Sequence, residues 1–125
     1  MPKKDELAIR WLETPNDHDY PSAASFLSLV FDETTSQAFI EKLKTAPIIH
    51  FKAKDLFRAS GLSLLGVSNL HVRRDIKKIK SHEAISPILL VRDQTHGKLI
   101  IADGYHRLCA VYKYDEDALI PCKIV

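Results

Sequence analysis

One short segment near the C-terminal end combines the residue types that an anion-binding turn needs. An apolar stretch ends at Asp103, and Gly104 follows in the position of a tight turn. A helix predicted to begin at Tyr105 would carry His106 and Arg107 in its first turn. The free N–H groups of a helix N-terminus attract anions, and a guanidinium can hold two phosphate oxygens at once. The spacing therefore predicts a site for a phosphate group.

Three of these side chains have both a chemical and a structural interpretation. Arg107 could clamp a phosphate, or it could form a salt bridge with Asp103 or Glu116. His106 could donate a hydrogen bond to a phosphate or act as a general acid, or it could bond to the backbone. Asp103 could hold Mg²⁺ or accept a hydroxyl proton, or it could cap the following helix. Asp103 and His106 are the catalytic candidates.

A second helix is predicted to supply the opposite wall of this site. Asn69 is a plausible start signal for a helix from His71 to about Ser81. The basic residues Arg74 and Lys78 are expected farther round this helix, and a solvated face is the alternative role for its basic residues. The ligand-contact candidates are the helix start and the charges beside its apolar stripe: Asn69, His71, Arg73 and Lys77.

The other residues that could do chemistry form weaker patterns. Asp17, His18 and Asp19 resemble part of a metal site, but no further ligand follows at a fixed spacing, so a loop is the alternative and the metal ligands stay unknown. Cys109 and Cys122 have no C-x-x-C spacing, and both are expected to be small buried residues.

Composition limits the class of protein. The 125 residues fit one domain, with 46% hydrophobic and 27% charged residues. A net charge of +2 is too small to indicate nucleic-acid binding through bulk charge. No apolar stretch is long enough to span a bilayer, so no membrane partner is expected. The first residues lack the apolar core of a signal peptide, and a cytoplasmic location is therefore expected.

Apolar spacing and helix signals predict the elements that position the site. Residues 1–61 are expected to form a helical extension, with helices over Leu7–Leu12, Ser22–Phe31 and Ala53–Ser60. A further helix is expected between the second and third of these; it starts with the Thr34–Gln37 capping box and ends before Pro47. Residues 62–125 are expected to hold strands at Leu62–Val67, Ile88–Val91, Leu99–Ala102 and Leu119–Val125, and a helix at Tyr105–Tyr114. The predicted fold class is α+β, a small mixed sheet with packed helices.

This second part, residues 62–125, resembles the ParB/sulfiredoxin superfamily. The pieces that carry the resemblance are, in chain order, the strand Pro87–Arg92, the G-x-H-R turn Gly104–Arg107, Ala110 three residues beyond the arginine, and the closing pair Ile120–Pro121. The N-terminal residues 1–61 do not take part in it. The resemblance suggests a separate bacterial branch of the superfamily with its own helical cap.

The resemblance implies a nucleotide at the Gly104–Arg107 turn. In sulfiredoxins the equivalent His-Arg pair lies at ATP phosphates, in partitioning ParB proteins the turn holds CTP, and free-serine kinases carry a similar D-G-H-H-R run. A nucleoside triphosphate with Mg²⁺ is therefore the implied cofactor. Sulfiredoxins need a Cys where Tyr105 stands, so their reductase chemistry is not expected. The kinases use a Glu base near the first strand, and Asp75 or Glu83 is a poor substitute for it on sequence alone.

Two hypotheses of different classes follow. The leading one is a domain that binds a nucleotide or a phosphometabolite at the Gly104–Arg107 turn, with phosphoryl transfer or nucleotide hydrolysis as the reaction if it is an enzyme. The alternative is a non-enzymatic module that binds DNA or a protein through the basic helix and the N-terminal helices. An affinity for duplex DNA that falls steeply as the salt concentration rises would favour the binding-module hypothesis.

Overall fold

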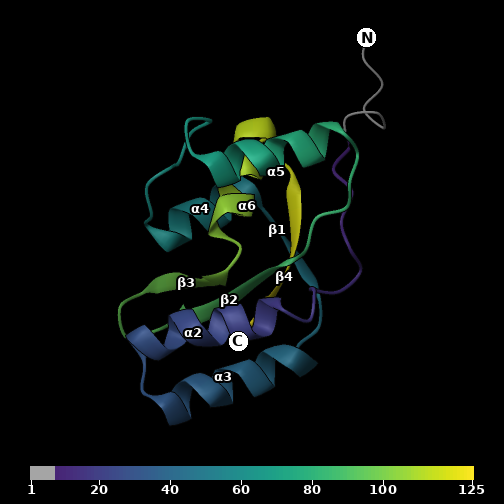
Figure 1. Ribbon diagram of the computed structural model, residues 1–125. Coiled ribbons are helices and arrows are strands. Elements are labelled where there is room, and N and C mark those ends of the chain that lie inside the picture. The colour runs from purple at the N-terminus through teal and green to yellow at the C-terminus, as the bar shows by residue number, and fades with distance from the viewer. Residues whose placement is uncertain (1–7) are drawn as a thin grey trace.

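The computed structural model describes residues 8–125 as a mixed sheet with helices on both faces (Figure 1). The helices are α2 (Asp19–Val30), α3 (Glu33–Thr45), α4 (Ala53–Ser60), α5 (Leu70–Lys80) and α6 (Tyr105–Tyr114). The strands are β1 (Ile49–Lys52), β2 (Ile88–Asp93), β3 (Lys98–Asp103) and β4 (Leu119–Ile124). The predicted fold class, a small mixed α+β sheet with packed helices, is confirmed.

The sheet has the strand order β1-β4-β2-β3. The central strands β2 and β4 are parallel, whereas β1 pairs antiparallel with β4 and β3 pairs antiparallel with β2. Consecutive residues of β2 enter different cores, because successive side chains of a strand point to opposite faces. Ile88 and Leu90 pack with α4, α5 and α6, while Leu89 and Val91 pack with α2 and α3. Both faces of the central strand are therefore covered, as its continuous apolar run predicts.

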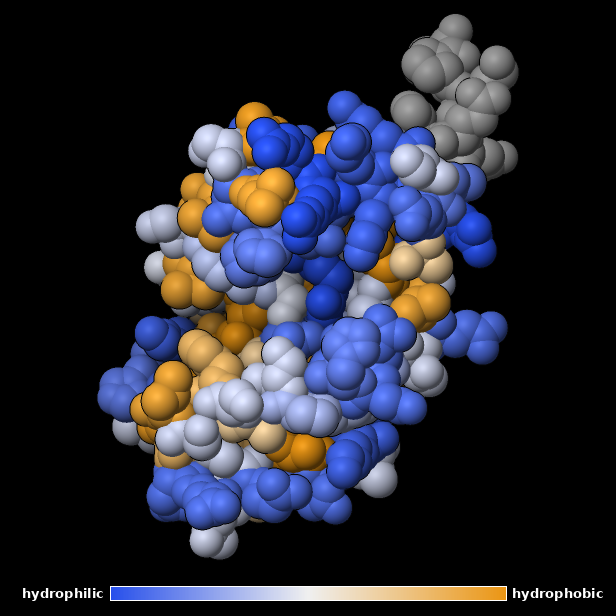
Figure 2. Space-filling model, in the orientation of Figure 1, coloured by the Kyte–Doolittle hydropathy of each residue, from blue (hydrophilic) through white to orange (hydrophobic). Residues whose placement is uncertain are grey.

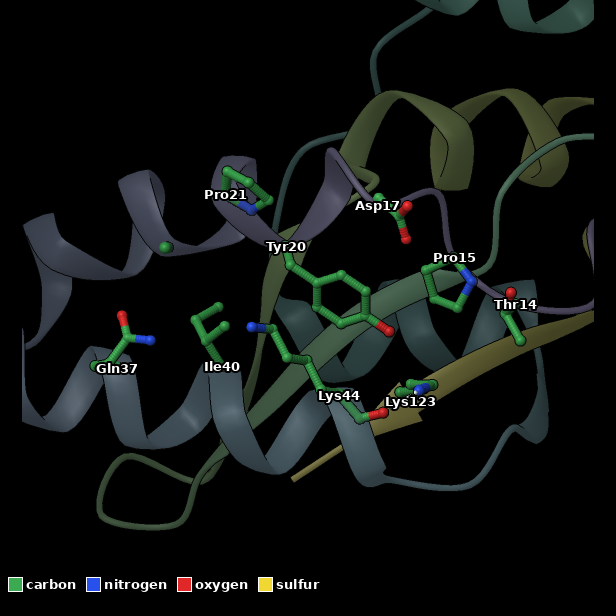
Figure 3. Close-up of a pocket in the computed structure, with 10 residues that line it drawn as sticks. Thr14, Pro15, Asp17, Tyr20, Pro21, Gln37, Ile40, Lys44 and Lys123 are labelled. Carbon is green, nitrogen blue, oxygen red and sulfur yellow. Dashed lines mark hydrogen bonds between the residues drawn. The ribbon is translucent and has the colours of Figure 1, made fainter.

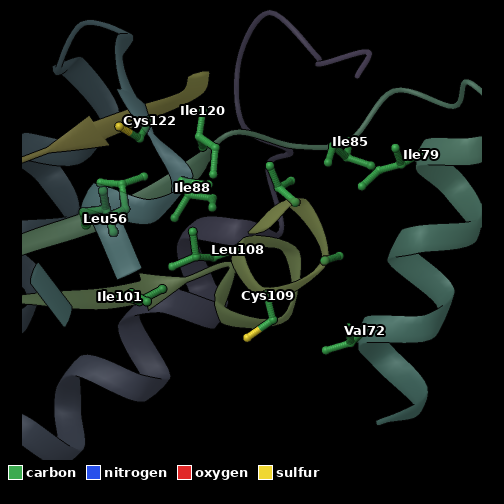
Figure 4. Close-up of a cluster of buried hydrophobic side chains, with 14 residues drawn as sticks. Leu56, Val72, Ile79, Ile85, Ile88, Ile101, Leu108, Cys109, Ile120 and Cys122 are labelled. Atoms are coloured by element: carbon green, nitrogen blue, oxygen red, sulfur yellow. The ribbon is translucent and has the colours of Figure 1, made fainter. Parts of the chain in front are cut away.

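The core on the α4–α6 side fixes the elements that carry the candidate site (Figure 4). Leu108 of α6 is fully buried against the sheet, and Val72 and Ile79 of α5 are buried in the same cluster. Burying side chains of this size stabilises the fold by about 1.5–3 kcal/mol each. The cluster therefore holds α5 beside α6, at the end of the sheet where β3 finishes.

The N-terminal part differs from the prediction at two places. Within Leu7–Leu12, the described residues 8–12 are not helical; Leu12 N donates to Ile85 O at 2.9 Å, and Trp11 forms a bridge with Ile85. The short strand β1 was not predicted, and it lies inside the expected helical extension. Its residues are mostly exposed, so its strand conformation depends on pairing with β4 rather than on an apolar pattern of its own.

Helix starts were predicted less well than helix ends. α2 begins at Asp19, before the predicted Ser22, because Pro21 is tolerated in a first turn, where its missing N–H needs no partner. α3 is capped by Asp32, whose side chain accepts from Thr35 N at 2.7 Å, and not by Thr34. The helix Ala53–Ser60 is confirmed, and Gly61 closes it with a φ of 67°.

The elements around the turn are confirmed with one exception. The helix Tyr105–Tyr114 and the strands β2, β3 and β4 are present, and Asn69 caps α5. The strand predicted at Leu62–Val67 is wrong, since this segment is a loop with exposed leucines. Tyr105 anchors the loop, because its hydroxyl donates to Ser63 O. Across residues 8–125, none of the helices combines the length and the apolar character needed to cross a membrane.

Candidate functional site

A polar cavity of about 300 Å³ lies where α5 faces the turn between β3 and α6. We call it the α5–α6 cavity. It brings together three cationic side chains, two carboxyl groups and two histidines, and most of the surface in the region of α5 is hydrophilic in Figure 2. The residues that line it are His71, Arg74, Asp75, Lys78, Asp103, Gly104, Tyr105, His106 and Arg107. The whole predicted turn from Asp103 to Arg107 therefore faces one cavity.

The backbone of the turn has the geometry that an anion needs. Gly104 has a φ of 112°, and its carbonyl accepts the first helical hydrogen bond of α6, from Leu108 N at 2.9 Å. The amides of the first turn that follow have no partner within the helix, so they are free to bind an anion. A side chain at Gly104 would collide, since a Cβ there would lie 2.9 Å from Arg107 Nη2 and 3.0 Å from Ile88 Cγ1.

Arg107 is held by the protein itself. Its Nη2 donates to Asp103 Oδ2 at 3.1 Å and to Pro87 O at 3.3 Å, and it lies 3.7 Å from Asp19 Oδ2. Its Nε is buried and has no hydrogen-bond partner among the described residues. The structure therefore contains the salt bridge between Arg107 and Asp103 that was one of the two interpretations of Arg107. The guanidinium lines the cavity, but one of its two terminal nitrogens is already engaged.

Asp19 is a residue that the structure places beside this turn and that the sequence analysis did not connect to it. Its side chain is buried, with 2% of the residue exposed, and it accepts a hydrogen bond from Ser86 Oγ. Ser86 Oγ in turn accepts from Asn16 N at 3.1 Å. The segment Asp17–Asp19 is thus not assembled as a metal site, because its one buried carboxylate is used by Ser86 and Arg107. Nothing in the local spacing indicates a contact so distant in the chain.

Two histidine rings lie against each other in the α5–α6 cavity. The ring centroids of His71 and His106 are 4.8 Å apart. Burial lowers the pKa of His106, and the neighbouring His71 lowers it further, whereas Asp75 opposes the shift. His106 is therefore neutral near neutral pH, and a neutral imidazole can both donate and accept a hydrogen bond.

The wall formed by α5 differs from the predicted one. His71 lines the cavity as predicted, but Asn69 serves as the helix cap, with its Oδ1 accepting from His71 N and Val72 N at 3.0 and 3.2 Å. Arg73 and Lys77 do not line the cavity. Their neighbours do, because the helical positions that share a face with His71 are three, four and seven residues farther on: Arg74, Asp75 and Lys78.

Burial raises the pKa values of the two carboxyl groups that line the cavity, Asp75 and Asp103, although Arg107 acts in the opposite direction on both. Between the ordinary pKa of an aspartate and this raised pKa, the native state holds protons that the unfolded chain releases. We therefore expect the contribution of the two carboxyl groups to the free energy of unfolding to fall as pH rises through that window and to be constant above it. Asp75→Asn and Asp103→Asn each remove this fall.

The measurement is urea unfolding of the three proteins from about pH 4 to pH 7. The free energy of unfolding of each variant, minus that of the wild type, should increase with pH. A difference that does not change with pH would contradict the raised pKa values of these two carboxyl groups.

A larger cavity, of about 650 Å³, lies between the start of α2, α3 and the end of β4 (Figure 3). Lys123 in its wall is 6% exposed, and its Nζ donates to Lys44 O at 3.0 Å, in the last turn of α3. An ammonium at a helix C-terminus satisfies a free carbonyl and the helix dipole. The lysine therefore has a structural role there, and the α5–α6 cavity is the better candidate site.

Among residues 8–125 there is no group of three or more His, Cys, Asp or Glu side chains placed to hold a metal ion. Comparison of the chain with protein-family models, with curated proteins and with solved structures finds no match.

Proposed function

We propose that this chain binds a phosphate-bearing ligand, a nucleotide or a phosphometabolite, in the α5–α6 cavity. The observation that carries the proposal is the position of Arg74 and Lys78 across the cavity from the first turn of α6. Two cationic side chains then face backbone amides that have no partner within the helix. This combination neutralises a phosphate from two sides. The resemblance of Gly104–Arg107 to ParB/sulfiredoxin proteins supports the same ligand class.

The residues of the turn have separate roles in this proposal. Gly104 lets the backbone turn with a positive φ and pack against Ile88, and the amides after it donate to the phosphate oxygens. Tyr105 and His106 line the same cavity, with His106 able to donate as a neutral imidazole. Arg107 contributes positive charge from the back of the turn, where Asp103 partly compensates it.

Phosphoryl transfer or phosphate hydrolysis is the reaction class that this arrangement would serve, because such reactions depend on positioning and on charge neutralisation. A magnesium ion that accompanies a nucleotide needs only one or two protein carboxylates beside the phosphates. Asp103 offers one such carboxylate in the α5–α6 cavity. Asp103 and the neutral His106 would be the groups that accept or deliver a proton.

The test is a melting-temperature screen over nucleotides and phosphometabolites, with and without Mg²⁺, followed by calorimetry on the best ligand. Arg74→Ala and Lys78→Ala should each weaken binding about 10- to 100-fold, the worth of one charge-assisted hydrogen bond. Arg73→Ala and Lys77→Ala are the matched controls, since they remove the same charges from the same helix outside the cavity. They should change affinity by less than about threefold.

The DNA-binding alternative predicts a different pattern. A duplex held by the exposed surface of α5 would lose affinity in all four variants, with a steep dependence on salt and no need for a nucleotide. That result, or a screen in which no phosphate compound shifts the melting temperature, would contradict the proposed function.

A further inference from the structure

We infer that the ligand of the α5–α6 cavity presents a hydrogen-bond donor beside its anionic group, and that Asp75 accepts this hydrogen bond. The cavity then selects an oxyanion that retains a proton or carries a hydroxyl, such as a phosphate, over one that has only acceptor oxygens, such as sulfate. Asp75 is thus a specificity-determining residue. The inference rests on the proposed function and names the class of ligand that the site takes.

Asp75 differs from the other buried or half-buried carboxylates of the turn region in having no protein donor. Asp103 accepts from Arg107, and Asp19 accepts from Ser86. In the part of the chain that the structure describes, Asp75 accepts no hydrogen bond and has no cationic nitrogen within 4.0 Å, although it is half-buried and lines the cavity. Both oxygens of Asp75 keep contact with solvent, and a ligand that fills the cavity displaces that water. The carboxylate is then left without a donor unless the ligand supplies one, and leaving it unpaired is costly.

The surroundings of Asp75 show why a ligand donor is needed. Its neighbours on α5 are His71 and Lys78, and those on α6 are His106 and Arg107. None of them reaches it, since Nη2 of Arg107 is directed to Asp103 and the two histidine rings lie against each other. Burial outweighs the attraction of these cationic groups and raises the pKa of Asp75. The carboxyl therefore lacks the ion pair that would otherwise satisfy it.

Phosphate and sulfate separate this role from simple attraction of anions. They have similar size and shape, but sulfate carries no proton at neutral pH, whereas phosphate retains one or two. An ionised Asp75 repels the acceptor oxygens of sulfate and accepts a hydrogen bond from phosphate. A site built to bond a donor rejects the analogue that lacks it, because its own polar group is then left unpaired. Arg74 and Lys78 attract both ions and do not distinguish them.

The experiment compares the binding of inorganic phosphate and sodium sulfate to the full chain by calorimetry, at neutral pH and constant ionic strength. The wild type should prefer phosphate by roughly 10- to 100-fold. Asp75→Asn should reduce this preference to less than about threefold, mainly through tighter binding of sulfate, because the amide can donate to it. Asp55→Asn, on the exposed surface of α4, is the control and should keep the wild-type preference.

The outcomes separate the inference from the proposed function. If the wild type binds phosphate and sulfate equally, or if Asp75→Asn keeps the preference for phosphate, the inference is wrong while the anion site stands. If neither ion binds and no phosphate compound shifts the melting temperature, the proposed function fails and the inference fails with it. Circular dichroism confirms that Asp75→Asn is folded, and Asp75→Ser provides a smaller second variant with the same expected loss of preference.

Discussion

Replacing Gly104 with alanine is expected to lower the free energy of unfolding by about 2–5 kcal/mol, and the melting temperature by roughly 8–20 °C. Two causes add at this position. The φ of 112° is one that a side chain rarely adopts, and a Cβ would lie 2.9 Å from Arg107 Nη2 and 3.0 Å from Ile88 Cγ1. The collision would also push Arg107 out of place, so ligand binding should weaken together with stability.

Two other glycines separate these causes. Gly97 also has a positive φ, 63°, but a Cβ there meets nothing within 4 Å, so Gly97→Ala should cost only the backbone term, about 1–2 kcal/mol. Gly66 has neither the positive φ nor a close neighbour, so Gly66→Ala should change stability by about 0.5 kcal/mol or less. Chemical denaturation of the three variants measures the series. Equal losses for Gly104→Ala and Gly97→Ala would mean that the turn has room for a side chain.

The turn could be predicted because its signals are local. A run of apolar residues, a glycine and a helix start stand next to one another in the sequence, and the helix Tyr105–Tyr114 has the predicted bounds. The strand β1 could not be predicted in this way. Its four residues are mostly exposed, and they become a strand because their backbone pairs with β4, more than sixty residues farther along the chain. The strand predicted at 62–67 is absent for the opposite reason, since the apolar residues of this segment have no strand partner and stay largely exposed.

The candidate site was predicted in part for a related reason. Periodicity places the charges of α5 around a cylinder, but it does not say which side of the cylinder faces α6. Arg73 and Arg74 are adjacent in sequence, and only the packing of Val72 and Ile79 against α6 and the sheet decides which arginine lines the cavity. Asp19 was missed because its partner Arg107 comes from the other end of the chain, and no local pattern encodes that contact.

Replacing Arg107 with methionine is expected to destabilise the protein by about 3–5 kcal/mol even when no ligand is present. The guanidinium is the cation for two carboxylates, at 3.1 Å from Asp103 and 3.7 Å from Asp19. Asp19 is 2% exposed and the Arg107 side chain is 18% exposed, so solvent screens this cluster weakly. Removing the cation leaves a buried carboxylate whose remaining neighbours are Ser86 Oγ, which donates to Oδ2, and the exposed His18, whose Nε2 lies 3.5 Å from Oδ1. Chemical denaturation of the ligand-free protein measures the loss.

A second substitution shows whether the loss comes from the unpaired charge. Asp19→Asn in the Arg107→Met background removes the uncompensated carboxylate, so the double variant should recover at least about 1–2 kcal/mol. Arg74→Met is the control, because this exposed arginine forms no ion pair with a described residue and should change stability by about 0.5 kcal/mol or less. If Arg107→Met is as stable as the wild type, the cluster does not hold α2 against the turn.

This cluster also changes how a loss of ligand binding should be interpreted. A guanidinium shared by two carboxylates is a weaker anion receptor than its formal charge suggests, because their charges offset its own. Weaker binding in an Arg107 variant could then arise from a displaced turn as well as from a lost contact with the ligand. Arg74 and Lys78 have no such structural partner among the described residues, so their substitution reports on the ligand alone. If Arg74→Ala and Lys78→Ala bind normally while Arg107→Met does not, the anion lies on the Arg107 side of the cavity and the wall formed by α5 is not part of the site.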